Sequence, residues 1–131
     1  MLTKHLALLD HGTAEKIFSG DKSIEGRFTK LKIAPFNQVG AGDLVYIKES
    51  GMKKIIGQFR VDRVIYFDHP RKSEIDEIKR KYLKELSVDK DFWWDRENIN
   101  YISLIFIDRV QKFVVPPIIK HSDRRGWVVL P

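Results

Sequence analysis

The chain has 131 residues, the usual size of one domain, and 43% of them are hydrophobic, which excludes a chain that is disordered by composition. It contains no cysteine, so disulfide bonds, thiolate zinc sites and cysteine nucleophiles are excluded. With 24 basic and 18 acidic residues, the net charge is +6. This charge attracts polyanions, nucleic acid first and a membrane surface second, although many small basic proteins bind neither.

The first part of the chain is expected to form a strand, a helix and a second strand. Residues 5–10 have the length and alternation of a short strand, and the apolar side chains within 12–20 recur at helical spacing. Gly20 is expected to cap this helix, because glycine adopts the left-handed conformation without strain. The segment SIEGRF at 23–28 alternates with period two and predicts a strand.

Alternation with period two also marks the later strands. Further strands are predicted at 44–49, 55–67, 101–114 and 127–131. The short turn between 44–49 and 55–67 makes these two strands a hairpin, and Gly57 is expected at a bulge. The strand over 101–114 is expected to bend near Asp108.

The clearest helix pattern covers 73–86, where one apolar stripe is present and Ser73 with Asp76 forms a start similar to a capping box. Residues 89–100 are expected to form a polar loop or a short helix. Strands outnumber helices and do not alternate with them. The predicted fold class is therefore α+β: a small, mostly antiparallel β-barrel with helices packed at its openings.

The sequence carries neither a targeting pattern nor a metal-binding pattern. The N-terminus is too short and too polar for a signal peptide, and no long apolar run follows, so we expect a cytoplasmic protein with no membrane partner. The four histidines are dispersed without HxH or HExxH spacing, and no phosphate-binding glycine loop is present. We expect no metal and no cofactor.

A spaced set of polar residues follows the first helix. The helix ends in Gly-x-Lys, the next strand carries Glu-x-Arg, and Gly-Asp-x-Val comes later in the chain. These residues are Gly20, Lys22, Glu25, Arg27 and the segment Gly42-Asp43-Leu44-Val45. The pattern resembles the ASCH domain family, which belongs to the PUA-like barrels. The resemblance covers about residues 5–67 and extends more loosely to the C-terminus.

This resemblance implies a single ASCH/PUA-like domain over 1–131, with a helical insertion at about 71–98. It also implies RNA or a nucleotide-like small molecule as the partner. Some members of the family hydrolyse the acetyl amide of N4-acetylcytidine or cut RNA, and related barrels cage modified bases with aromatic side chains. A binding protein, a hydrolase and a reader of modified bases therefore remain as alternatives.

The strand at 23–28 supplies the first candidate residues. Ser23, Glu25 and Arg27 share one face, because side chains two apart on a strand point the same way, and Lys22 lies at the junction with the helix. Arginine offers a donor fork to phosphate or a base edge, and glutamate accepts from an exocyclic amine. The alternative is a surface strand whose Glu25–Arg27 pair contributes less than about 1 kcal/mol.

The hydrolase alternative depends on Lys22 and Glu25. The amidohydrolase branch uses a lysine, a threonine three positions later and a distant glutamate. Lys22 matches the lysine, but Glu25 stands at the threonine position, and no motif identifies Glu85 or Glu97 as the distant glutamate. A Lys22–Glu25 pair would still suit acid–base catalysis. Binding therefore ranks above catalysis.

Basic and aromatic residues near the end of the chain complete the prediction. Cations that meet phosphates and rings that stack on bases are what single-stranded RNA binding needs. Trp127 is expected in the core or at the barrel end instead. The candidate residues for contact with RNA or another ligand are Lys22, Ser23, Glu25, Arg27, Trp93, Trp94, Lys120, Arg124 and Arg125.

Overall fold

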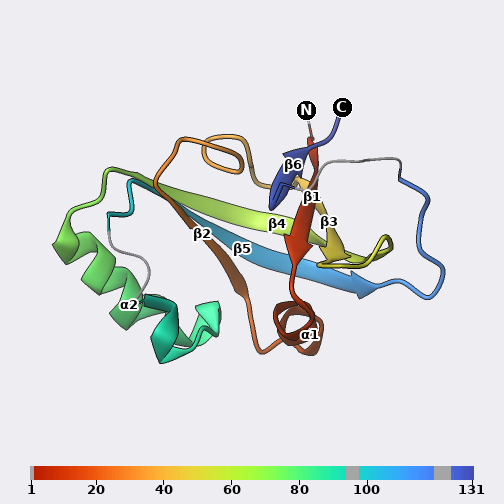
Figure 1. Cartoon of the computed structure of the whole chain (residues 1–131), viewed down its shortest axis with the longest axis horizontal. Coiled ribbons are helices and arrows are strands. Elements are labelled where there is room, and N and C mark those ends of the chain that lie inside the picture. The colour runs from red at the N-terminus through yellow and green to blue at the C-terminus, as the bar shows by residue number, and fades with distance from the viewer. Residues whose placement is uncertain (1, 94–97, 120–124) are drawn as a thin grey trace.

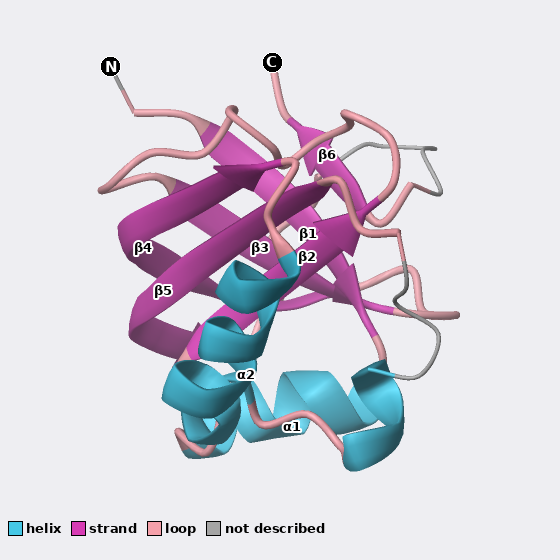
Figure 2. Cartoon of the chain, turned by 90° about the vertical axis from the view of Figure 1, so that its left-hand side faces the viewer, coloured by secondary structure: helices cyan, strands magenta, loops and turns pink. Residues whose placement is uncertain are grey.

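A computed structural model of the chain describes residues 2–93, 98–119 and 125–131. Within these residues, six strands form one curled sheet, and the helices gather at one end of it (Figures 1 and 2). The strands are β1 (Lys4–Leu9), β2 (Ile24–Thr29), β3 (Leu44–Glu49), β4 (Ile55–Asp68), β5 (Tyr101–Lys112) and β6 (Trp127–Val129). The helices are α1 (His11–Ser19), α2 (Lys72–Leu86) and the short 3-10 helix η1 (Lys90–Trp93).

The sheet has the strand order β2-β5-β4-β3-β1-β6, which places β2 and β6 at its two edges. The β1–β3 pair is parallel, and the other pairs in this order are antiparallel. The sheet curls enough for Arg27 on β2 to donate to the Gly126 carbonyl next to β6, at 3.2 Å. The predicted α+β class and barrel-like, mostly antiparallel sheet are confirmed, and the barrel takes the form of a half-barrel.

Irregular pairing of the long strands produces part of this curl, because β-bulges bend a strand and increase its twist. Ile47 pairs with Gly57, but the next residue of β3, Lys48, pairs with Ile55, so one residue of β4 is skipped at the predicted bulge. A Cβ atom at Gly57 would lie 2.6 Å from the backbone oxygen of Gln111, which explains the need for glycine there. The register of β5 also shifts next to Asp108, as expected.

Local capping explains where the helices begin and end. Asp10 accepts a hydrogen bond from the Thr13 backbone N–H at 2.8 Å at the start of α1. Gly20 ends α1 in the left-handed conformation, with φ at 86°, which confirms the predicted cap. The expected capping partner in α2 was wrong: Glu74, not Asp76, accepts from the Arg71 backbone N–H at 3.0 Å, because the helix begins at Lys72.

The described residues form three hydrophobic clusters, two of which include helix residues. The first core joins α1 to the sheet and includes Ile17, Phe59 and Trp127. The second core joins α2 to β2 and β5 and includes Ile24 and Leu86. Since alternate residues of β2 point to opposite faces, the neighbours of Ile24 along the strand are directed away from the α2 core. Among the described residues, no helix is both long enough and apolar enough to cross a membrane.

Candidate functional site

Lys22 lies between the end of α1 and the start of β2, and its side chain is buried. The residue is only 4% exposed, and its ammonium donates to the Leu86 carbonyl at the C-terminal end of α2. The same ammonium lies 3.6 Å from Oε1 of Glu25. The carbonyls at a helix C-terminus carry partial negative charge, so this contact also stabilises α2.

Glu25 connects Lys22 to Arg27. Its second oxygen, Oε2, accepts a hydrogen bond from Arg27 Nη2 at 3.3 Å, and Glu25 itself is 5% exposed. Arg27 also donates to the carbonyls of Leu8 at 3.4 Å and Gly126 at 3.2 Å. The three residues therefore form a chain of charged groups, Lys22–Glu25–Arg27, which we call the charged chain. It lies where the two edges of the half-barrel approach each other.

Burial changes the acid–base properties of the charged chain. Removal from water disfavours the ammonium and lowers the pKa of Lys22, and the nearby Glu25 carboxylate offsets only part of this effect. Lys22 therefore loses its proton more readily than a lysine at the surface does.

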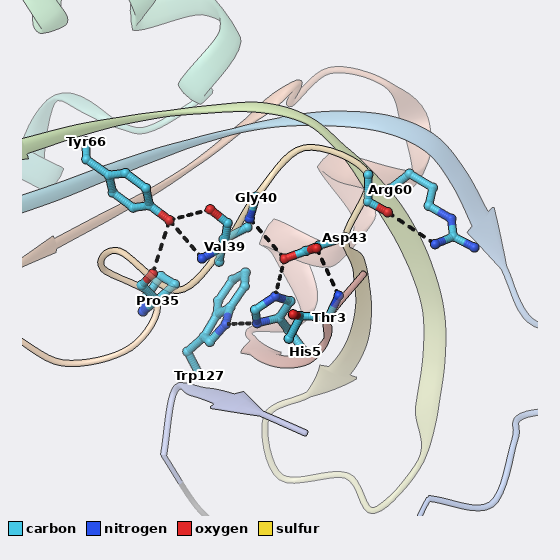
Figure 3. A network of polar contacts seen from close by, with 10 residues as sticks. Thr3, His5, Pro35, Val39, Gly40, Asp43, Arg60, Tyr66 and Trp127 are labelled. Atoms are coloured by element: carbon cyan, nitrogen blue, oxygen red, sulfur yellow. Dashed lines mark hydrogen bonds and ion pairs between the residues drawn. The ribbon is translucent and has the colours of Figure 1, made fainter. Parts of the chain in front are cut away.

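A second polar network joins Trp127, His5 and Asp43 (Figure 3), and Trp127 connects it to the charged chain. The Arg27 guanidinium lies 5.2 Å from the centre of the Trp127 ring. The Trp127 indole N–H points to Nδ1 of His5 at 3.1 Å, and Nε2 of His5 lies 2.8 Å from Oδ2 of Asp43. Because an indole nitrogen is only a donor, Nδ1 must accept, and the proton on Nε2 is donated to Asp43. The two contacts therefore define the orientation and the tautomer of the His5 ring.

Asp43 anchors this network to the backbone. Its carboxylate accepts from the backbone N–H groups of Thr3, at 3.0 Å, and Gly40, at 2.9 Å, as well as from His5. Burial alone would raise the pKa of Asp43, but the hydrogen bonds from His5, Thr3 and Gly40 outweigh it and hold the pKa below its ordinary value. The motif Gly42-Asp43 thus joins the loop before β3 to β1.

One side of the charged chain opens into a cleft of about 530 Å³, here called the first cleft. It lies between α1, β2 and the segment that follows α2. Its volume is in the range of small-molecule sites. The charged residues of its lining are Asp10, Lys16, Lys22, Glu25, Asp89 and Asp91, and its aromatic residues are Phe28 and Phe92. Carboxylates thus outnumber ammonium groups among the described residues of the first cleft.

The other side of the charged chain opens into a second cleft of about 440 Å³. Among the described residues, the charged groups of its lining belong to Arg27 and Arg125, and Trp127 also lines it. The remaining lining is apolar or neutral and includes Thr29 and Gln38. Since Glu25 lines the first cleft, Arg27 lines the second, and the two side chains are 3.3 Å apart, the clefts adjoin at this ion pair.

The structure brings together only some of the residues that the sequence suggested. Lys22, Glu25 and Arg27 form the charged chain, and Arg125 joins Arg27 in the second cleft. Ser23 is exposed and precedes β2, and it lines neither cleft. The positions that lie outside the described residues are Trp94, Glu97, Lys120 and Arg124.

Trp93 and Glu85 have packing positions away from the clefts. Trp93 packs edge-on against Phe28 and Phe92, with ring centres 5.3 and 5.0 Å apart, and contacts the second core. Its neighbour Phe92 lines the first cleft instead. Glu85 lines neither cleft, and its carbonyl accepts from the Ser23 backbone N–H at 3.0 Å. The interpretation of Trp127 as a core residue is confirmed by its 3% exposure.

Sequence reasoning missed His5 and the acidic residues of the first cleft. The sequence contained a signal for the role of Asp43, because a carboxylate directly before a strand often accepts from nearby backbone N–H groups. It contained no signal for His5, since a single histidine in an alternating strand does not indicate which residue it contacts. Across residues 2–93, 98–119 and 125–131, no group of three or more histidine, aspartate or glutamate side chains is placed to hold a metal ion.

The chain matches no protein family model and no curated protein sequence. Solved structures nevertheless share its fold. The crystal structure of ASCH from Zymomonas mobilis has a TM-score of 0.74 and 14% identity, over 98% of this chain and 87% of that chain. A tyrosine-to-phenylalanine variant of that protein has a TM-score of 0.75 and 14% identity, over 98% and 90%.

A further solved structure, of hypothetical protein PH0355, has a TM-score of 0.52 and 18% identity, over 80% of this chain and 97% of that chain. At these identities the likeness concerns the fold alone. The chain therefore has the α+β fold of the ASCH protein structures from Zymomonas mobilis.

Proposed function

We propose that this protein binds single-stranded RNA, or a nucleotide-like fragment of it, at the two adjoining clefts. The observation that carries the proposal is the buried charged chain, Lys22–Glu25–Arg27, which lies between two clefts of suitable size. Burying charged groups costs several kcal/mol of desolvation per ion, and a fold gains little stability from such a pair. Charged groups that are retained at a cleft despite this cost are candidates for binding a ligand.

The first cleft has groups that suit a nucleobase. Phe28 and Phe92 supply apolar surface for the faces of the base. Glu25 accepts from an exocyclic amine, and Lys22 donates to a base carbonyl or ring nitrogen. The fold neighbours support the proposal, because the ASCH domain is associated with RNA binding.

Filling the first cleft is expected to weaken RNA binding at least tenfold. Gly12 lines this cleft, and a Cβ atom added there meets only Asp10 Oδ1, at 3.5 Å, so Gly12→Tyr places a ring in the cleft without changing the charge. The measurement is fluorescence anisotropy with a labelled single-stranded RNA at low salt. Gly40→Tyr is the matched control, since an added Cβ there meets nothing within 4 Å.

The salt dependence of the wild-type protein completes this test. The affinity for the RNA is expected to fall with salt, with a log–log slope of about −0.7 for each phosphate contacted. No binding at low salt, or equal affinity of wild type and Gly12→Tyr, would contradict the proposal. An equal loss of affinity in Gly40→Tyr would show that the first cleft is not the cause.

Hydrolysis of a nucleobase amide is a second candidate, favoured by the buried position of Lys22. An amine with a lowered pKa is a better base or nucleophile at neutral pH than an exposed lysine. Glu25, 3.6 Å away, is placed to exchange a proton with it. The rings of Phe28 and Phe92 in the first cleft suit the face of the acetylated cytosine ring.

If the protein is such a hydrolase, the wild type is expected to convert N4-acetylcytidine and water to cytidine and acetate. The hydrolysis rate of Lys22→Gln is expected to be at least a hundredfold lower. Chromatographic detection of cytidine measures the product. Lys53→Gln, in the exposed turn between β3 and β4, is the control and is expected to keep the wild-type rate. Absence of cytidine from the wild-type reaction, or equal rates for wild type and Lys22→Gln, would remove this candidate.

A further inference from the structure

We propose that the two clefts divide the ligand by charge: the second cleft binds the phosphate group, and the first cleft binds the uncharged base or nucleoside part. This inference rests on the proposed function and assigns a chemical class to each cleft. It predicts a direction for the ligand across the Glu25–Arg27 pair, with the sugar at the point where the clefts adjoin.

The first cleft is unfavourable for phosphate because carboxylates outnumber cations among the described residues that line it. These carboxylates belong to Asp10, Glu25, Asp89 and Asp91, and the ammonium groups to Lys16 and Lys22. A phosphate in this cleft would therefore face a net repulsion, whereas a neutral base with an exocyclic amine would find acceptors.

The second cleft has the opposite character. Among the described residues, its lining contains the guanidinium groups of Arg27 and Arg125 and no carboxylate. The Arg27 guanidinium is held in place by the carbonyls of Leu8 and Gly126 and lies near the Trp127 ring. A guanidinium that is already oriented loses less freedom when it binds an oxyanion. Thr29 and Gln38 add neutral hydrogen-bonding groups.

A negative charge placed in the second cleft tests this division. Gln38 is exposed and lines the second cleft, so Gln38→Glu adds a carboxylate there with almost no change of shape. Isothermal titration at low salt with cytidine 5′-monophosphate and with cytidine separates the phosphate from the nucleoside. Gln38→Glu is expected to lower the affinity for the monophosphate about fivefold or more and to change the affinity for cytidine less than twofold. It is also expected to lower the affinity for single-stranded RNA.

Gln111→Glu is the matched control, because Gln111 is exposed on β5, lines neither cleft and keeps its acceptor oxygen for Gln58. It is expected to leave both affinities unchanged. Arg125→Gln is the second variant and is expected to lower the affinity for the monophosphate but not the affinity for cytidine. If RNA and the monophosphate bind wild type and Gln38→Glu equally, the inference is overturned and the proposed function stands. If neither RNA nor the monophosphate binds wild type, both are overturned.

Discussion

Replacing Glu25 by leucine is expected to lower the free energy of unfolding by about 3–5 kcal/mol, the usual cost of leaving a buried charge without its partner. Leucine is close to glutamate in size, so the loss reflects charge rather than a cavity. Lys22 and Arg27 would keep their carbonyl partners but lose the only carboxylate that the structure places within 4 Å of either among the described residues. Urea denaturation at pH 7, followed by circular dichroism, measures the change.

A double substitution separates the charge effect from packing. Lys22→Met alone is expected to cost about 1–3 kcal/mol, because the Leu86 carbonyl loses its donor. In the double variant Lys22→Met with Glu25→Leu, the buried ammonium and its carboxylate leave together. The loss of unfolding free energy in this variant is expected to be smaller than the sum of the losses in the two single variants, by at least 1 kcal/mol.

The control for Glu25 is Glu77→Leu on the exposed side of α2, which is expected to change the free energy of unfolding by no more than about 0.5 kcal/mol. A loss below 1 kcal/mol in Glu25→Leu would mean that water reaches the charged chain and screens it. Additive losses in the double variant would mean that Lys22 and Glu25 are not energetically coupled. Either result would contradict the buried ion pair described above.

Asp43→Asn is expected to destabilise the protein by about 2–4 kcal/mol, because one amide cannot replace a carboxylate that accepts three hydrogen bonds. The asparagine NH₂ would face a backbone N–H group or the His5 Nε2–H, which are all donors. The His5 ring would then lose its fixed tautomer, and with it the acceptor for the Trp127 indole N–H.

The effect of this substitution is expected to depend on pH in a defined direction. The pKa of Asp43 lies below its ordinary value of 3.8 in the folded protein. Its contribution to stability is therefore fully present above pH 3.8 and is lost as the pH falls through the lower, folded pKa. The difference in unfolding free energy between wild type and Asp43→Asn should stay constant from pH 5 to 7 and shrink below about pH 4.

Urea denaturation in steps from pH 3 to pH 7 checks this profile. Asp62→Asn, an exposed aspartate on β4, is the matched control and is expected to stay within about 0.5 kcal/mol of wild type across the range. A difference between wild type and Asp43→Asn that stays equal at pH 3 and pH 7 would show that Asp43 does not titrate below its ordinary value in the folded state.

Local patterns in the sequence determined the elements and their order. The α1 cap at Gly20, the bulge at Gly57 and the alternation of 23–28 depend on neighbouring residues only, because backbone conformation and side-chain period are local properties. The same alternation placed Glu25 and Arg27 on one face of a strand. The sequence therefore predicted that these two members of the charged chain lie side by side. The predicted capping partner in α2 was wrong because two acidic residues near the start of the helix, Glu74 and Asp76, could both take this role.

The partners of these residues were decided only by the tertiary structure. Lys22 meets a carbonyl 64 positions later, Arg27 meets one 99 positions later, and Trp127 meets His5 across 122 positions. These contacts exist because the sheet curls until β6 lies beside β1 near the β2 edge, and because α2 packs on β2. The sequence by itself thus determined which charged residues share a strand face. Their burial, the charged residues that line each cleft and the His5–Asp43 network depend on contacts between distant segments, which local periodicity does not encode.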